Sequence, residues 1–297
     1  MSGGGPVPRS LALATDIDVL ARERVVRRRA DHLVVRSPGN PGHYSGNLLI
    51  FDDPPGPGDR VRWNATFEAE FADEPRVRHR TFAWERTDGS LGSAREEFVA
   101  AGYELEQIVA LIAGPHELRA HPRENGAARI RTLDPAPGAD ERLWQQVIEL
   151  EVAGRDRRFD EDIHRQFIRT RKRELRELFL AGRGAWYVAL DGGGREVLGS
   201  CGVVVTAGRG RFQSVETAEE HRRRGICSRL VVEAALISGA ERLVICADPG
   251  YHALGLYESL GFRAVERVAG VMLHPPSEAP LSGAVNRSFT AGFRAQW

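Results

Sequence analysis

Two apolar segments in the second half of the chain are joined by a turn that is typical of an antiparallel pair of strands. They are AWYVAL, which ends at Leu190, and EVLGSCGVVVT, which begins at Glu196, with the turn DGGG after the first. Glycine-rich connections of this length are characteristic of β-hairpins. Helical and extended patterns alternate along the rest of the chain, which favours an α/β protein. Because the hairpin excludes a purely parallel sheet, the sequence predicts a mixed α/β fold.

A segment without periodicity divides the chain into two parts. Gly114–Ala127 contains several residues that break helices and strands, and we place a domain boundary there. The expected organisation is an N-terminal α/β domain over 1–120, a second domain over 127–276 and a tail over 277–297. The aromatic residues of the tail leave three possibilities open: it docks on the body of the protein, it docks on a second copy in a homodimer, or it is mobile.

Several elements are expected from local patterns. Thr15 and Asp18 have the spacing of a helix N-cap and its third residue, and the basic run Arg27–Arg29 suits the end of the same helix. Two pairs of short strands are expected at Tyr103–Ala113 and at Phe262–His274. A long amphipathic helix is expected over roughly 161–180.

Composition excludes some classes of partner. The 297 residues contain 41 acidic and 41 basic side chains, so no global field favours nucleic acid or an anionic membrane. No apolar run approaches the ~20 residues that cross a bilayer. The three cysteines lack CxxC spacing and the first residues lack the apolar core of a signal peptide. We therefore expect a cytoplasmic protein with free thiols and no membrane partner.

The basic residues are unusual in kind, since Lys172 is the single lysine and all the others are arginines. Such a bias is typical of genome composition, so clusters of arginine carry little weight. The segment Arg165–Leu175 is rich in them, but they alternate with the apolar face of a helix. A solvated helix face is therefore favoured over an RNA-binding surface.

The sequence HRRRGICSRL follows a predicted strand and opens a predicted helix. Val215 and Thr217 end the strand, Arg222–Gly225 form the turn, and Ile226 begins the helix. The first N–H groups of a helix have no partners and lie at the positive end of its dipole, so they favour an anion. A P-loop and a dinucleotide fingerprint are both excluded, because the required GK[ST] and additional glycines are missing. These residues alone support a phosphate site and an exposed basic turn equally.

A second element, ALGLYESLGF, lies at the end of the next predicted helix. Together, SVETAEEHRRRGICSRLVVEAA and CADPGYHALGLYESLGF resemble the acetyl-CoA-binding core of the GNAT (GCN5-related) N-acetyltransferases. Arg222–Cys227 occupy the six positions of that family's loop pattern, [QR]-x-x-G-x-[GA], and Tyr257, Gly261 and Phe262 match its later tyrosine and Gly-Phe pair. Over Arg129–His274 the resemblance implies the family's fold: a mixed, mostly antiparallel, splayed sheet flanked by helices.

A faint internal repeat extends the resemblance to the N-terminal part. FVAAGYELEQIVALIAG (Phe98–Gly114) resembles YESLGFRAVERVAGVML (Tyr257–Leu273), since each has an aromatic residue, a Gly-aromatic pair and a charged-apolar strand. A generic helix C-cap explains this pattern as well as a duplication does. Combined with the family resemblance, the repeat implies a second, degenerate GNAT-like domain at the N-terminus.

The resemblance also implies site residues and an activity. The activity is transfer of an acetyl group from acetyl-CoA to a primary amine, which needs no metal. Tyr257 is implied as the general acid that protonates the departing thiolate, a role suited to a phenol. The splayed strand pairs with the pantetheine arm and the loop amides hold the pyrophosphate. The implied cofactor-binding residues are Val215, Glu216, Thr217, Arg222, Arg223, Arg224, Gly225, Ile226, Cys227 and Ser228.

Two residues depart from the family pattern. Cys227 replaces a small Gly or Ala, and Gly250 stands where the family often has an Asn that contacts the cofactor. These departures favour the alternative of a non-catalytic, CoA-binding regulatory module. The acceptor is left open, with a small molecule favoured over a polycationic substrate. The general base is left open among Glu216, Asp248, His221 and His252.

Overall fold

The computed structural model describes residues 5–122, 125–156 and 159–275. The elements that precede the expected boundary are α1 (Leu11–Asp18), β1 (Val25–Arg28), β2 (His32–Arg36), η1 (Tyr44–Gly46), β3 (Leu48–Phe51), α2 (Asp59–Glu70), β4 (Arg80–Trp84), α3 (Arg95–Ala100), β5 (Glu104–Ala113) and η2 (Pro115–Glu117). The elements that follow it are β6 (Arg129–Leu133), α4 (Glu141–Ala153), α5 (Glu161–Leu180), β7 (Gly184–Leu190), β8 (Val197–Thr206), β9 (Arg209–Thr217), η3 (Glu219–His221), α6 (Ile226–Ile237), β10 (Arg242–Ala247), α7 (Ala253–Ser259) and β11 (Arg263–Leu273).

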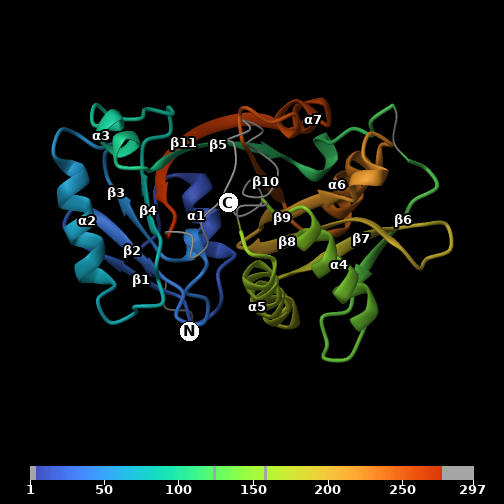
Figure 1. Cartoon of the computed structure of the whole chain (residues 1–297). Coiled ribbons are helices and arrows are strands. Elements are labelled where there is room, and N and C mark those ends of the chain that lie inside the picture. Colours follow the sequence, from blue (N-terminus) through green and yellow to red (C-terminus); the bar gives the residue numbers. More distant parts are fainter. Residues whose placement is uncertain (1–4, 123–124, 157–158, 276–297) are drawn as a thin grey trace, which may run out of the picture.

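All the strands of the described residues belong to one eleven-stranded sheet, in the order β1-β2-β3-β4-β11-β5-β10-β9-β8-β7-β6. Neighbours in the sheet run antiparallel except for the pairs β3–β4 and β9–β10, which are parallel. Figure 1 shows the N-terminal strands on one side of the molecule and β6–β9 on the other. The predicted mixed, mostly antiparallel α/β class is confirmed.

Helices cover both faces of the C-terminal strands because these strands are apolar on both sides. In β7, Trp186 and Val188 pack with α4 and α5, whereas Tyr187 and Ala189 pack with α6 and α7. The alternation is the period of two that is expected of a strand buried on both faces. The sheet therefore separates an α4–α5 side from an α6–α7 side, and a molecule that touches both must pass through it.

The two parts of the chain interleave at the centre of the sheet. β11, from the C-terminal part, lies between β4 and β5, and β5 lies between β11 and β10. The parts are thus joined through main-chain hydrogen bonds within a continuous sheet. The order of elements in the N-terminal part, with a parallel pair β3–β4 joined through α2, repeats the pair β9–β10 joined through α6.

The first helix differs from its prediction. α1 ends at Asp18, and its N-cap is Ser10, whose side chain accepts the N–H of Leu13, so the cap predicted at Thr15 is wrong. Glu266 of β11 completes the cap, because its carboxylate accepts the N–H groups of Leu11 and Ala12 at 3.0 and 3.2 Å. A distant strand therefore supplies the anion that stabilises this helix start. The basic residues predicted to end this helix lie largely in β1, which pairs with β2.

The predicted strand pairs at Tyr103–Ala113 and Phe262–His274 are instead the single long strands β5 and β11. The two strands pair with each other along most of their length, and a register shift lies between Ala264 and Glu266. Their length follows from their central place in the sheet, where each has a neighbour on both sides. A local pattern shows where polar residues interrupt a strand, but it does not show whether a partner strand continues past them.

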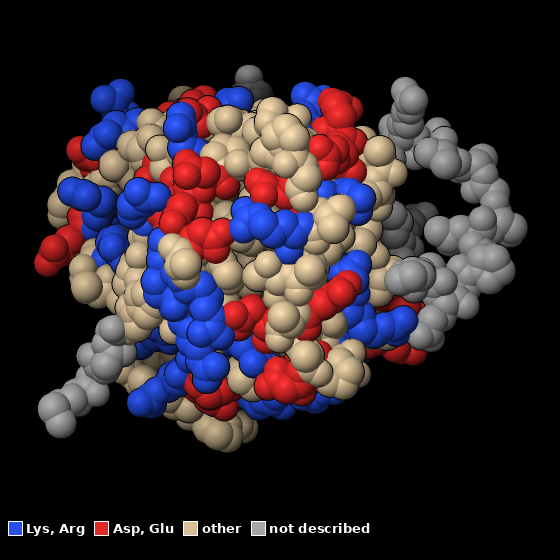
Figure 2. Space-filling view, turned by 90° about the vertical axis from the view of Figure 1, so that its left-hand side faces the viewer, with Lys and Arg blue, Asp and Glu red and all other residues tan. Residues whose placement is uncertain are grey.

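Charged side chains of both signs are mixed on the side of the molecule that is formed by the N-terminal part (Figure 2). Basic groups there are paired with acids: Arg36 lies 2.6 Å from Asp73 and Arg62 lies 2.6 Å from Asp31. The predicted solvated face of α5 is wrong at two positions, since Arg171 and Lys172 are buried. Among the residues that the structure describes, no helix has the length and apolar character that crossing a bilayer requires.

Candidate active site

The sheet opens between β9 and β10. The parallel pairing covers Arg209–Arg211 of β9 and ends at Val244 of β10, although β10 continues to Ala247 and β9 to Thr217. Each strand keeps its other neighbour beyond that point, because β10 stays paired with β5 and β9 with β8. The main chain of β9 after Arg211 therefore faces a gap in place of a partner strand. This is the splay that the family resemblance implies.

A β-bulge at the splay turns the side chains of β9. Glu216 lies opposite Ser200, but Gln213 lies opposite Gly202, so β9 carries an extra residue in this interval. Ser214 has φ of 44°, an uncommon conformation for a residue with a side chain. Without the bulge Gln213 and Glu216 would lie on opposite faces; with it, both lie on the α4–α5 side.

The loop after β9 leads into α6 through two left-handed residues. Arg223 has φ of 59° and Gly225, the N-cap of α6, has φ of 72°. No described side chain caps the start of α6. The first intrahelical bond runs from the N–H of Arg229 to the carbonyl of Gly225, at 3.2 Å, so the preceding N–H groups have no acceptor within the helix. Such a start is suited to an anion.

One cavity of about 750 Å³ joins the loop, the splay and both faces of the sheet. It is lined by nine of the ten predicted cofactor-binding residues and by Tyr257, whereas Arg224 is exposed outside the lining. Gly154, at the end of α4, and Cys246 of β10 line the cavity as well, and the sequence did not single them out for this site. The passage through the sheet is what allows one molecule to reach both sides.

Tyr257 lies on α7 at the wall of the cavity and is 5% exposed. Its ring packs edge-on against Phe262, with 6.2 Å between the ring centroids. Burial, together with the neighbouring thiols of Cys227 and Cys201, raises the pKa of Tyr257 well above its ordinary value. The phenol therefore keeps its proton at neutral pH and can donate it.

The thiols near Tyr257 are protonated as well. Burial raises the pKa of Cys227 to about 12 and the pKa of Cys246 to about 11. It also raises the pKa of Cys201 well above its ordinary value. Because the thiolate is the nucleophilic form of cysteine, none of these side chains is prepared for attack on a thioester at neutral pH.

All four residues considered as general base line the cavity. Glu216 is half-buried against α4, and burial, followed by the neighbouring Glu151 carboxylate, raises its pKa to about 8, against the opposing effects of Lys172 and Arg222. Asp248 accepts the N–H of Gly250 at 2.6 Å, the bond of a turn-forming carboxylate. The remaining two are histidines: His252 is exposed and is the N-cap residue of α7, and His221 lies at the rim of the loop.

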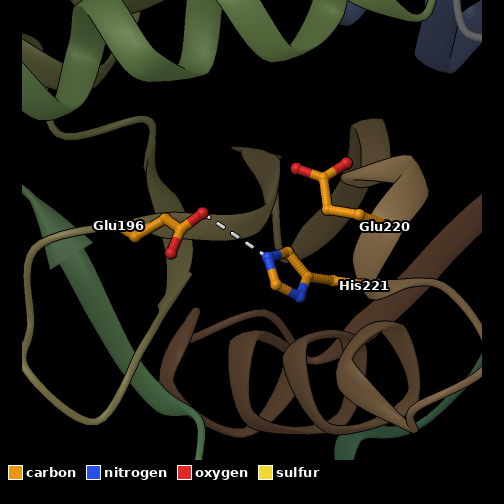
Figure 3. A group of neighbouring side chains, drawn as sticks. All are labelled: Glu196, Glu220 and His221. Carbon is orange, nitrogen blue, oxygen red and sulfur yellow. Dashed lines mark hydrogen bonds and ion pairs between the residues drawn. The ribbon is translucent and has the colours of Figure 1, made fainter.

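His221 belongs to an exposed group with Glu196 and Glu220, shown in Figure 3. Its Nε2 lies 3.5 Å from Glu196 Oε1, and one ligand atom from each of the three residues lies within 4.8 Å of the others. Both carboxylates are exposed to solvent. Acidic groups are common at such surface positions without a bound ion.

The corresponding place in the N-terminal part is filled by aromatic rings. β3 and β4 stay paired to Phe51 and Trp84, so no splay opens between them. Phe98 stands at the position that the repeat aligns with Tyr257. Trp63 of α2 stacks on Phe51, with ring centroids 3.9 Å apart, and lies 5.6 Å from Phe98, and all these rings are buried.

The start of α2 also differs from that of α6. Gly58, its N-cap, has a left-handed φ of 83°, and Gly225 of α6 is left-handed as well, but the first helical residue of α2 is Asp59. The Asp59 carboxylate accepts the N–H of Gly56 at 2.8 Å. This fixed anion in the first turn disfavours a phosphate at the same place.

Comparisons with known proteins concern the fold that carries this site. Residues 182–264, which carry the loop, the splay and Tyr257, match the model of the acetyltransferase (GNAT) domain family. A functionally unknown conserved protein from Staphylococcus epidermidis has a similar structure, with 12% identity and a TM-score of 0.70 over 86% of this chain and 95% of that chain. No sequence match is found among curated proteins.

Two GCN5-related N-acetyltransferases are also similar. The one from Sphaerobacter thermophilus has 20% identity and a TM-score of 0.54 over 86% of this chain and 84% of that chain. The one from Kribbella flavida has 13% identity and a TM-score of 0.58 over 91% of this chain and 97% of that chain. At these identities the likeness concerns the fold. Residues 182–264 therefore form a domain of the GNAT acetyltransferase family, in a chain that has the fold of GCN5-related N-acetyltransferases.

Proposed function

We propose that the protein transfers an acetyl group from acetyl-CoA to a primary amine, by direct attack of the amine within a ternary complex. The observation that carries this proposal is the single cavity that joins the start of α6, the splayed main chain of β9 and Tyr257, and reaches Glu216 on the α4–α5 side. These are the groups needed to hold a diphosphate, an extended arm, a leaving thiolate and an acceptor amine.

The coenzyme is proposed to bind with its pyrophosphate on the N–H groups of Arg223–Ser228. Those amides lie where the dipole of α6 favours an anion, and Gly225 allows the main chain to come close to the phosphate oxygens. Val215–Thr217 of β9 have no partner strand on the β10 side, so their main chain can bond there to the amides of the pantetheine arm as a neighbouring strand would. Arg222 and Arg223 add positive charge at the rim.

In the proposed reaction, proton transfers are divided between two residues on opposite sides of the sheet. Glu216 takes a proton from the acceptor ammonium, which leaves an amine with a free electron pair. As the new C–N bond forms at the thioester carbonyl and the C–S bond breaks, Tyr257 donates its proton to the departing thiolate. The second proton of the attacking nitrogen is lost to solvent, and solvent returns a proton to the phenolate.

Glu216 is the preferred base among the four candidates because of where it lies. It reaches the cavity from the α4–α5 side, opposite the α6–α7 side on which Tyr257 lies, so an acceptor can approach the thioester from the other face of the sheet. Asp248 is engaged in its turn, and the imidazoles belong to the loop and α7 on the coenzyme side. A half-buried carboxylate beside the end of α4 favours a small amine over a folded protein as the acceptor.

We infer that only the C-terminal part binds the coenzyme. The closed pairing of β3 and β4, the stacked rings of Phe51 and Trp63 and the carboxylate of Asp59 all oppose binding at the N-terminal counterpart. The N-terminal part is thereby assigned a structural role, in which it supplies β5 as a neighbour for β10 and β11.

The activity is tested by following release of the coenzyme A thiol from acetyl-CoA in the presence of a panel of small primary amines. The proposal expects release that depends on one or more of these amines, together with a product heavier by one acetyl group. The alternative, a non-catalytic CoA-binding module, is favoured by Cys227 in the loop and by Gly250, which has no side chain to contact the coenzyme. Tight binding of acetyl-CoA without amine-dependent release would support that alternative.

A further inference from the structure

The single lysine of the chain is buried beside the proposed active site. Lys172 is the one lysine among 41 lysine and arginine residues, and it is 2% exposed on α5. Its ammonium forms an ion pair with Glu151 of α4, which is also buried. It lies over the ring of Trp186, at 3.8 Å from the centroid. A cation held by a carboxylate and an aromatic face in this way is fixed in position.

Glu216 of β9 reaches the end of the helix that carries Glu151. A Cβ placed on Gly154 would lie 3.4 Å from Glu216 Oε2, so the carboxylate rests against the end of α4, one turn beyond Glu151. The bulge at Ser214 brings Glu216 to this side of the sheet. Three charged groups from three separate elements thus lie together, and one of them faces the cavity.

The charges that act on Glu216 have opposite signs. The Glu151 carboxylate favours the protonated form of Glu216, whereas the Lys172 ammonium and the Arg222 guanidinium favour its ionised form. Lys172 is influenced in turn by Glu151, Arg171 and Glu216, and burial is the largest cause that lowers its pKa. The lysine ammonium is a compact point charge whose pKa shifts readily on burial, whereas the guanidinium of arginine stays charged.

We propose that Lys172 and Glu151 form a positioning pair for Glu216, which hold its carboxylate at the acceptor side of the splay and set the pH at which it takes a proton from the acceptor amine. This inference rests on the proposed acetyl transfer, because the pair acts through the base and touches neither substrate.

The test measures the protonation of Glu216 directly. The full-length protein is labelled with ¹³C at the glutamate carboxyl carbon, its spectrum is followed from pH 4 to 10, and the Glu216→Gln variant assigns the signal. The expected midpoint lies well above that of exposed glutamates. Lys172→Met should raise this midpoint, and Glu151→Gln should lower it, each by about one pH unit or more. The double variant should return toward the wild-type value.

Glu174→Gln is the matched control. Glu174 is a buried carboxylate on the same helix as Lys172, and it pairs with Arg171 at 3.4 Å, but it is not among the charges that act on Glu216. Its removal should leave the Glu216 midpoint within a few tenths of a pH unit. If Lys172→Met does not fold, Glu151→Gln keeps the test decisive, because the proposed pair requires its midpoint to fall below the wild-type value.

The same variants are compared in the pH profile of amine-dependent thiol release. The acidic limb of kcat/KM should move with the Glu216 midpoint, upward for Lys172→Met and downward for Glu151→Gln. A wild-type midpoint in the ordinary range, or shifts of the same sign in both variants, overturns the proposed pair. Opposite shifts of the midpoint without any acetyl transfer by the wild type would contradict the proposed function and leave the charge effect of the pair in place.

Discussion

Phe98 and Tyr257 stand at the same step of two repeated helix–strand units. The Phe98 carbonyl accepts a hydrogen bond from the N–H of Tyr103 at 3.0 Å, and the Tyr257 carbonyl accepts one from the N–H of Phe262 at 3.1 Å. In both turns the residue before the donor is a left-handed glycine. The strands after these turns, β5 and β11, are neighbours in the sheet. The faint repeat in the sequence therefore corresponds to two equivalent elements of the fold.

The register of the two strands is symmetric as well. Ile108 lies opposite Val268, and Val109 lies opposite Arg267. The repeat aligns Ile108 with Arg267 and Val109 with Val268, so each of these pairs is the image of the other under a two-fold relation between the units. One unit presents a phenol to a cavity, and the other presents a phenyl ring to a filled core.

Replacement of Tyr257 by Phe should lower turnover by at least about tenfold while acetyl-CoA binding is kept. The variant removes the proton donor and retains the ring that packs on Phe262. Turnover is measured by thiol release and binding by calorimetry. An unchanged turnover would remove Tyr257 from the proposed reaction.

Cys227→Ala should keep activity and should bind coenzyme A at least as tightly as the wild type. The Cys227 thiol of the wild type is protonated, so no acetyl-cysteine intermediate is expected. The smaller alanine side chain also leaves more room at the last loop position. Steady-state kinetics and binding of the variant check this expectation. Loss of turnover in a folded Cys227→Ala protein would contradict direct transfer.

Glu216→Gln should make the protein more resistant to heat at alkaline pH. The folded state holds the pKa of Glu216 near 8, above the ordinary 4.5 of the unfolded chain. The stability that its neutral form contributes is complete below the ordinary value and is lost as the pH rises toward 8. The neutral amide of the Glu216→Gln variant does not undergo this loss. At alkaline pH the free energy of unfolding of the variant should therefore exceed that of the wild type by ~1–2 kcal/mol, which corresponds to a few degrees in Tm. Thermal unfolding of both proteins at pH 5 and pH 8.5 measures the difference, and an equal difference at the two pH values would contradict it.

Phe98→Ala should destabilise the protein without changing the affinity for acetyl-CoA. The side chain is fully buried among the rings of Trp63 and Phe82, and removal of such a ring costs about 3–5 kcal/mol. Urea unfolding and calorimetry at a temperature where the variant is folded check the two parts of the expectation. A weaker affinity would mean that the N-terminal part contributes to the coenzyme site.

The loop and Tyr257 could be predicted from the sequence because each depends on a short contiguous stretch. A strand, one glycine and a helix start suffice to place a set of free amides. The cap of α1 could not be predicted in this way, since Glu266 is separated from Ser10 by most of the chain. The spacing of Thr15 and Asp18 has the form of a cap, but a carboxylate from β11 decides where the helix begins.

The interleaving of β5 and β11 and the burial of Lys172 also escaped prediction. Strand partners are chosen by packing between distant segments, and no periodicity within a segment identifies them. A charged residue on an amphipathic helix is usually solvated, so Lys172 had the pattern of an exposed side chain. Its one detectable signal was its residue type, a lysine in a chain of arginines.

The central claim is that one coenzyme lies at the start of α6 and passes through the splay toward Tyr257. Calorimetric titration of the full-length chain with acetyl-CoA tests it most directly, with Cys227→Trp as the variant that fills the cavity wall. The account predicts one molecule bound per chain and loss of binding in the variant. Binding of two molecules per chain, or unchanged binding by the Cys227→Trp protein, would contradict it.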